Sequence, residues 1–272
     1  MRRESGPGMV GVVGAGSFVA RHLARALQGQ GIRVAPWSRS GGLAADVPPL
    51  DWVVCAPVWS APDVTPRLDA FSPRRVVVLS SMSVISKAES LDPVERALAQ
   101  RLAQGEAAWR AWAEARGVSL AVVRPTMIYG PGDRNVSRLA AWLRRIPWCP
   151  VWSEGAGLRQ PVRVEDLAAA LAVLVRDPSV SGTFSAGGGE VLSFRCMVER
   201  IAGACGRRVR FVRLCRRPWR ALLAAGSFVL PRFGLRAAMF RRTEEDLLQG
   251  EPPLWPVVGL VPGSFRLPSE GA

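Results

Sequence analysis

The sequence contains one lysine, one histidine and one tyrosine among its 272 residues. A single histidine, His22, and five scattered cysteines without a C-x-x-C pair leave no zinc-ligand pattern, so we expect no metal site and reduced thiols. No apolar stretch reaches the ~18 residues of a transmembrane helix. The first residues also lack the apolar run of a secretory signal, and we therefore expect a cytoplasmic protein.

The chain carries a large positive net charge, and nearly all of its basic residues are of one type. The formal net charge is +14, and every basic residue except Lys87 and the one histidine is an arginine. So uniform a choice, spread along the chain, indicates a compositional bias of the source rather than a binding surface. We therefore expect no nucleic-acid partner, because an anionic cofactor or substrate needs only a few of these charges.

The pattern of apolar residues predicts alternating strands and helices. A chain of this length with 49% hydrophobic residues can form one large α/β domain, alone or with a small lobe. The alternation predicts a Rossmann-type, doubly wound parallel sheet followed by a small C-terminal α+β substrate lobe. The expected strands are 9–13, 32–37, 51–56, 75–79, 118–123, 183–186 and 209–214, with an extended segment at 158–164. The expected helices are 18–27, 66–71, 93–116, 136–145, 165–175, 192–205 and 240–248.

The first of these units has the pattern of a dinucleotide-binding turn. The stretch MVGVVGAGSFVARHLARAL begins with an apolar strand, turns through Gly14 and Gly16, and enters a helix after Ser17 and Phe18. Glycines let the backbone approach a diphosphate, and the helix N-terminus offers amides and a partial positive charge. We expect these four residues to bind the cofactor. The alternative is that the glycines serve only the tight turn.

The end of the second expected strand bears on the choice of cofactor. An acidic residue there binds the ribose 2′-hydroxyl of NAD. This chain has Ser38 and Arg39 instead, which suit a 2′-phosphate, so NADP is slightly favoured over NAD. The alternative is that Arg39 is one more surface arginine. Ala56-Pro57 and Ser80-Ser81 follow two further strands, at the sheet edge where ligands of this fold lie.

Four segments resemble a known family. They are GAGSFVARHL (14–23), VVVLSSMSV (76–84), VVRPTMIYGPGDRNVSRL (122–139) and LRQPVRVEDLAAAL (158–171). Together they resemble the extended short-chain dehydrogenases/reductases, specifically the NAD-dependent epimerase/dehydratase family. The resemblance implies a nucleotide sugar or a related hydroxyl- or carbonyl-bearing compound as the small-molecule substrate.

The resemblance also implies residue roles. Ser81 resembles the active-site hydroxyl, although it is equally suited to cap a turn. Tyr129 is a second catalytic candidate, with a structural loop role as the alternative. The other implied residues are Ala56, Pro57 and Ser80 beside the cofactor, and Asn135, Arg138 and Arg159 toward the substrate.

One departure from the family is decisive for the chemistry. Its members use a tyrosine and a lysine four residues apart on a helix to move a proton. This chain contains no Tyr-x-x-x-Lys, and if Glu106 marks the register, the pair falls on Leu98 and Leu102. The chain is then either an enzyme with another proton donor or a non-catalytic cofactor-binding sensor or assembly protein.

The expected domains are a Rossmann domain over 8–190 and a substrate lobe over 191–272, with 126–160 contributing to the cleft. Within the lobe, the basic apolar piece Trp219–Phe240 either packs on the main domain or lies on a membrane surface. The long helix 93–116 suits a homodimer, but its apolar face serves an internal contact equally well.

Overall fold

The computed structural model describes residues 8–38, 42–43, 49–151, 154–213 and 242–267. The chain divides into two compact units. The first comprises Met1–Thr126, Val162–Gly187 and Gln249–Gly263, and the second Met127–Pro161, Gly188–Leu248 and Ser264–Ala272. Over the described ranges, no helix is long and apolar enough to cross a membrane, and no group of three metal-ligating side chains is found.

The first unit is built on a seven-stranded sheet. Its strands are β1 Met9–Val13, β2 Arg33–Ser38, β3 Gly42–Leu43, β4 Asp51–Val54, β5 Arg75–Leu79, β6 Ser119–Pro125 and β11 Gly182–Ala186. They lie in the order β11-β6-β5-β4-β1-β2-β3. Six of the strands are parallel, and only the two-residue β3 runs antiparallel. The strand order reverses at β1, which is the switch point where such sheets bind ligands. The Rossmann-type fold expected from the sequence is confirmed.

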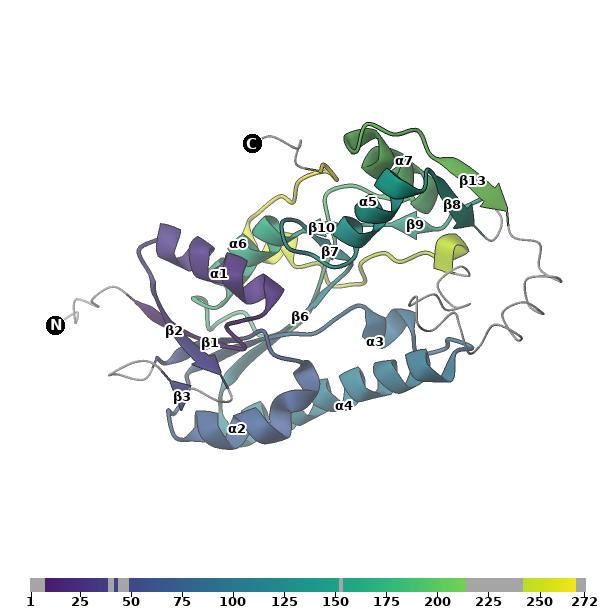
Figure 1. Cartoon of the computed structure of the whole chain (residues 1–272). Helices are drawn as coiled ribbons and strands as arrows, with labels where there is room; N and C mark the ends of the chain where they lie inside the picture. Colours follow the sequence, from purple (N-terminus) through teal and green to yellow (C-terminus); the bar gives the residue numbers. More distant parts are fainter. Residues whose placement is uncertain (1–7, 39–41, 44–48, 152–153, 214–241, 268–272) are drawn as a thin grey trace. The chain divides into compact units, whose positions relative to one another are not determined.

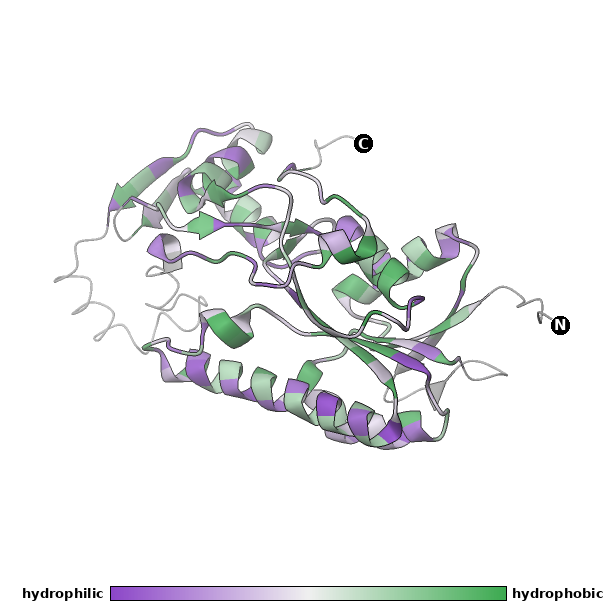
Figure 2. Ribbon diagram, turned by 180° about the vertical axis from the view of Figure 1, so that it is seen from behind, coloured by the Kyte–Doolittle hydropathy of each residue, from purple (hydrophilic) through white to green (hydrophobic). Residues whose placement is uncertain are grey.

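Helices cover both faces of this sheet (Figure 1). On one face α1 (Phe18–Gly29) packs against α6 (Val164–Leu174). On the other face α4 (Pro93–Arg116) packs against α2 (Ala61–Asp69). Figure 2 shows hydrophilic residues along α4 alternating with hydrophobic ones, as expected for a helix with one solvated face. The shorter elements of this unit are η1 Val58–Ser60, α3 Ser83–Ser86, β10 Val162–Arg163 and α10 Trp255–Val258.

A cluster of aromatic rings fills the core between the sheet and α4. Trp52 is fully buried, stacks on Phe71 with ring centroids 5.4 Å apart, and donates its indole N–H to the Pro49 carbonyl at 2.8 Å. Its ring lies against Gly11 of β1, where an added Cβ would overlap the indole. Gly11 therefore makes room for the tryptophan on the neighbouring strand.

The second unit combines two helices with short strand pairs. Helices α5 (Val136–Arg145) and α7 (Phe194–Ala204) pack together around buried apolar residues such as Leu143 and Ile201. The strands and turn of this unit are β7 Ile128–Tyr129, β8 Trp148–Val151, β9 Leu158–Arg159, β12 Leu192–Ser193, β13 Arg210–Arg213 and η3 Arg242–Glu244. Parallel β8 and β13 pair with each other, as do antiparallel β9 and β12.

Several expected elements differ from the observed ones. The helix predicted over 240–248 is wrong, because the described part of it forms only the turn η3 and then extended chain. Glu244 there accepts a hydrogen bond from the Gly155 amide, and Asp246 one from the Leu158 amide, both at 2.8 Å. These carboxylates bind a distant backbone instead of supporting a helix. The extended segment 158–164 is divided into β9 and β10, and α2 begins at Ala61 rather than at 66.

The thiols match the expectation of reduced cysteines for the part of the chain that is described. Cys55, Cys149, Cys196 and Cys205 are free. Burial raises the pKa of Cys55 to about 12 and that of Cys149 to about 11, so both are packing residues rather than nucleophiles. Cys215 and the piece Trp219–Phe240 lie outside the described residues.

Candidate functional site

The turn between β1 and α1 is shaped by Gly14. Its φ is +76°, and its amide donates to the Trp37 carbonyl at 3.0 Å. A Cβ at this position would lie 2.8 Å from the amide nitrogen of Ala56. Both the backbone conformation and the close approach to the end of β4 therefore require glycine.

Gly16 is exposed just before the N-terminus of α1. Ser17 is the N-cap, and its Oγ accepts a hydrogen bond from the Ala20 amide at 3.3 Å. Gly16 is exposed, and a Cβ added there would meet no atom within 4 Å. Phe18 is half-buried, and Ala20, 1% exposed, lets the helix pack closely. Open space before a helix N-terminus suits a diphosphate group.

The carboxyl ends of β1, β4 and β2 bring most of the cofactor candidates to one edge of the sheet. Ser38 ends β2, while Ala56 and Pro57 follow β4. Arg39, on which the choice of NADP depends, lies outside the described residues.

Ser80 and Ser81 leave β5 at the same edge, but their hydroxyls have different partners. Ser80 donates its Oγ proton to Glu106 at 2.6 Å. Ser81 accepts a hydrogen bond from the Ser83 amide at 3.1 Å, so it does cap the turn into α3. A hydroxyl that accepts in this way keeps its own proton. Ser81 is half-buried and can still donate to a ligand.

Glu106 is the centre of a buried polar network. In the sequence, Glu106 served only to mark the register of the long helix. It is 1% exposed and accepts from Arg124 Nε at 2.9 Å, from Arg124 Nη2 at 2.5 Å and from Arg110 Nη2 at 2.8 Å, besides Ser80. Burial alone would raise the pKa of this carboxyl. The hydrogen bonds from Arg124 and Ser80 and the charge of Arg124 outweigh it and hold the pKa below its usual value. Glu106 therefore stays ionised and positions the end of β5 rather than moving protons.

The two positions one and two turns before Glu106 are apolar. Leu102 is 5% exposed and belongs to the core cluster around Trp52 and Trp109, and Leu98 packs against the same cluster. Neither side chain carries a proton that can be transferred.

Tyr129 belongs to the second unit, where it is 1% exposed. Its hydroxyl donates to the Ser264 carbonyl at 3.4 Å and accepts from the Arg266 amide at 3.3 Å, while its ring meets Phe265 edge-on. These contacts favour the structural role for Tyr129.

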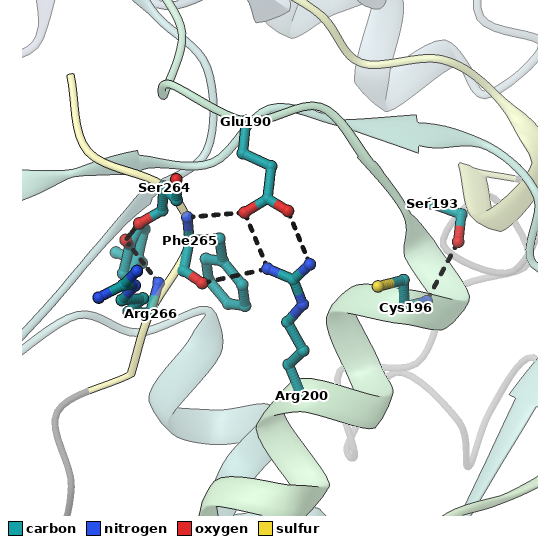
Figure 3. A network of polar contacts seen from close by, with 8 residues as sticks. Glu190, Ser193, Cys196, Arg200, Ser264, Phe265 and Arg266 are labelled. Atoms are coloured by element: carbon teal, nitrogen blue, oxygen red, sulfur yellow. Dashed lines mark hydrogen bonds and ion pairs between the residues drawn. The ribbon is translucent and has the colours of Figure 1, made fainter. Parts of the chain in front are cut away.

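The chain segment that Tyr129 contacts is fixed from a second direction (Figure 3). Glu190 accepts from the Phe265 amide at 3.2 Å and from Arg200 at 2.6 Å. The Arg200 hydrogen bond lowers the pKa of Glu190, which stays ionised. The network holds the segment Ser264–Arg266 within the second unit.

The three substrate candidates also belong to the second unit. Asn135 and Arg138, at the start of α5, are exposed. Arg159 is 5% exposed, and its Nη1 donates to the Glu245 carbonyl at 2.6 Å. Its guanidinium also lies over the Phe194 ring, 5.4 Å from the centroid.

A family model supports the resemblance. Residues 67–187 match the NAD dependent epimerase/dehydratase family. The predicted family is thus confirmed for this segment. No curated protein shows significant sequence similarity to the chain.

Solved structures of the same fold include nucleotide-sugar enzymes. The chain resembles MoeE5 in complex with UDP-glucuronic acid and NAD, at 21% identity and a TM-score of 0.68 over 95% of each chain. It resembles RMD from Pseudomonas aeruginosa complexed with NADPH, at 15% identity and a TM-score of 0.66 over 95% of this chain and 93% of the other. It also resembles the UDP-glucose 4-epimerase of Thermus thermophilus in complex with NAD, at 17% identity and a TM-score of 0.60 over 77% of this chain and 87% of the other. These likenesses show the Rossmann-type fold.

Proposed function

We propose that this chain binds a nicotinamide dinucleotide across the β1–α1 turn and acts on a nucleotide sugar or a related hydroxyl- or carbonyl-bearing compound. The observation that carries the proposal is the turn itself, where Gly14 lies against Ala56 and leaves open space at Gly16 before the helix. The family match and the NAD or NADPH named with the similar structures support it.

In this proposal different residues at the edge of the sheet bind different parts of the cofactor. Gly14, Gly16, Ser17 and Phe18 hold the diphosphate, because amides at a helix N-terminus favour an anion. Ser38 and Arg39 bind the adenosine ribose and favour NADP, while Ala56, Pro57 and Ser80 line the path toward the nicotinamide. The bound cofactor would supply or accept a hydride.

The chemistry of the site rests on Ser81. Its hydroxyl keeps a proton after accepting from the Ser83 amide, and we propose that it hydrogen-bonds the reacting oxygen of the substrate. Asn135, Arg138 and Arg159 are proposed for the substrate's polar groups, whereas the contacts of Tyr129 favour its structural role over a catalytic one. A positioned general acid contributes about 10²- to 10⁴-fold, so turnover without the usual tyrosine is expected to be slow.

A second function is favoured by a specific observation. Leu102 is buried in the core cluster, and it takes the place of the family's lysine if Glu106 marks the register of the helix. A protein that binds the cofactor without turning it over, as a sensor or assembly subunit, fits this replacement. A homodimer through α4 stays a prediction for either function.

Binding is tested by fluorescence titration of NADPH with two matched variants. Gly16→Asp places a carboxylate where the diphosphate is proposed, in space that the fold leaves open. Gly29→Asp adds the same charge at the other end of α1, also in open space. We expect Gly16→Asp to abolish binding and Gly29→Asp to bind like the unchanged chain. Equal affinities in all three proteins would refute the proposed site.

Turnover separates the two functions once binding is established. NADPH oxidation is followed with nucleotide sugars that carry a keto group and with simple carbonyl compounds. Oxidation that depends on the added substrate supports the enzyme. Tight binding without oxidation by any of them supports the sensor.

A further inference from the structure

The β8–β13 pair in the second unit has one inner and one outer face. The register pairs Arg210 with Trp148 and Val212 with Pro150. Side chains two residues apart share a face, so these four lie together on one side. On the other side Cys149 and Phe211 pack into the core of α5 and α7.

Two apolar side chains of the outer face are exposed. Trp148 is 43% and Val212 44% exposed. Trp142 fixes the backbone of Trp148, because its indole N–H donates to the Trp148 carbonyl at 3.1 Å and its ring meets that of Trp148 edge-on. Trp142 thus holds Trp148 in place while the ring of Trp148 stays partly exposed to solvent.

Three exposed arginines lie close to these two residues in the strand register or in the sequence. Arg210 lies on the outer face beside Trp148, Arg208 precedes β13, and Arg145 ends α5 three residues before Trp148. All three are exposed. The name "basic strand face" is used for Arg145, Trp148, Arg208, Arg210 and Val212.

The sequence around β13 contains positive charges only. From Arg200 to Arg242 it contains twelve arginines and no acidic residue, which is most of the net charge of +14. The strand β13 ends at Arg213, and the sequence that follows, residues 214–242, reads LCRRPWRALLAAGSFVLPRFGLRAAMFRR. Arginines flank an apolar run there, ALLAAGSFVL, at residues 221–230.

We propose that the basic strand face docks the second unit on an anionic lipid bilayer. Trp148 and Val212 enter the headgroup region, and Arg145, Arg208 and Arg210 contact lipid phosphates. The charge complements an anionic surface, and exposed tryptophan beside aliphatic residues is typical of an interfacial contact. The backbone of a nucleic acid would satisfy the arginines but offers no partner for Val212 or for the apolar residues after Arg213. The proposal does not depend on cofactor binding.

The test is flotation of the full chain with vesicles of phosphatidylcholine alone or mixed with phosphatidylglycerol. Each arginine near an anionic surface contributes about fivefold to the partition coefficient, so three contribute about a hundredfold. We expect binding to mixed vesicles only, and a loss of about a hundredfold in the triple variant Arg145→Gln/Arg208→Gln/Arg210→Gln. The matched control Arg25→Gln/Arg33→Gln/Arg176→Gln removes the same charge from exposed arginines of the first unit and should bind normally.

Trp148→Ser tests the apolar part of the contact, with circular dichroism to show that each variant is folded. A folded Trp148→Ser protein should bind mixed vesicles at least about tenfold more weakly. Equal loss in both triple variants would overturn the proposal, because it would reduce the effect to net charge. Unchanged binding of Trp148→Ser, or displacement of the chain from vesicles by duplex DNA at equal phosphate concentration, would overturn it as well.

Discussion

The β1–α1 turn and the β5–α3 segment leave the same edge of one sheet, yet they use their polar groups differently. At the first, Gly16 is exposed and faces open space just before the helix N-terminus. At the second, Ser80 donates to the buried Glu106. Leu102, four residues before Glu106 on α4, lies in the core, and Leu98, eight residues before it, packs against that core. The first segment thus keeps the glycine turn and open space of a dinucleotide-binding pattern, whereas the polar groups of the second are engaged within the protein.

The largest expected effect concerns Glu106. Glu106→Gln leaves the partly buried guanidinium of Arg124, which is 21% exposed, without its counter-charge, and breaking such a pair costs about 3 kcal/mol, the lower end of the range for buried pairs. The free energy of unfolding in urea should fall by about this amount. Glu114→Gln, on the exposed face of the same helix, should leave it unchanged. A small loss in Glu106→Gln would mean that the network contributes little to the fold.

The pH dependence of the same variant sharpens this point. The pKa of Glu106 is lower in the folded chain than the ordinary 4.5, so its stabilisation is present above that value and is lost as the pH falls through the folded pKa. The difference between the unchanged chain and Glu106→Gln should therefore be full at neutral pH and shrink in acid. A difference that stays constant to low pH would contradict the assignment.

The next effect concerns Ser81. Ser81→Ala removes the proposed donor at the reacting oxygen, and we expect turnover to fall at least about a hundredfold while NADPH affinity is kept. Because Ser81 also caps a turn, the thermal midpoint should be measured alongside. Unchanged turnover would remove Ser81 from the catalytic residues.

A third effect lies in the turn. Gly14→Ala forces a side chain into positive φ and against the Ala56 backbone, and should cost about 1–3 kcal/mol of stability. Gly16→Ala adds the same methyl group in open space and should cost little. Equal losses in urea unfolding would show that the two glycines do not differ as described.

The smallest expected effect is on cofactor choice. Arg39→Asp exchanges a partner of the 2′-phosphate for a partner of the 2′-hydroxyl. The ratio of NADPH to NADH affinities should fall by about tenfold and drop below one, because one charged contact of this kind contributes about 1.5 kcal/mol. A ratio unaffected by the substitution would leave Arg39 as a surface arginine.

Much of the first unit could be predicted because its signals are local. The bounds of α4 follow from the Asp92 N-cap, whose carboxylate accepts from the Val94 amide at 2.9 Å, and from Gly117 with φ +64°. The glycine turn can likewise be predicted from about a dozen consecutive residues. Such elements need no knowledge of distant partners.

The remainder depends on contacts far apart in the sequence. Glu106 looks like an ordinary helical glutamate until β6 brings Arg124 to it, and only its apolar neighbours on α4 could have signalled burial. The polar stretch 240–248 reads as a helix, but Glu244 and Asp246 bind backbone amides nearly ninety residues away. The carbonyl partners of Arg159 include that of Glu245, 86 residues away, which the sequence alone could not reveal.

The most direct test of the retained turn is hydrogen exchange of the full chain with and without NADPH. Bound diphosphate should protect the amides of Gly16, Phe18 and Val19, at the start of α1, and leave those of residues 29–31, at its end, unchanged. The Ser17 amide already donates to the Gly14 carbonyl at 2.9 Å and serves as an internal reference. Absence of protection at Gly16, Phe18 and Val19 under saturating NADPH would contradict the proposed site.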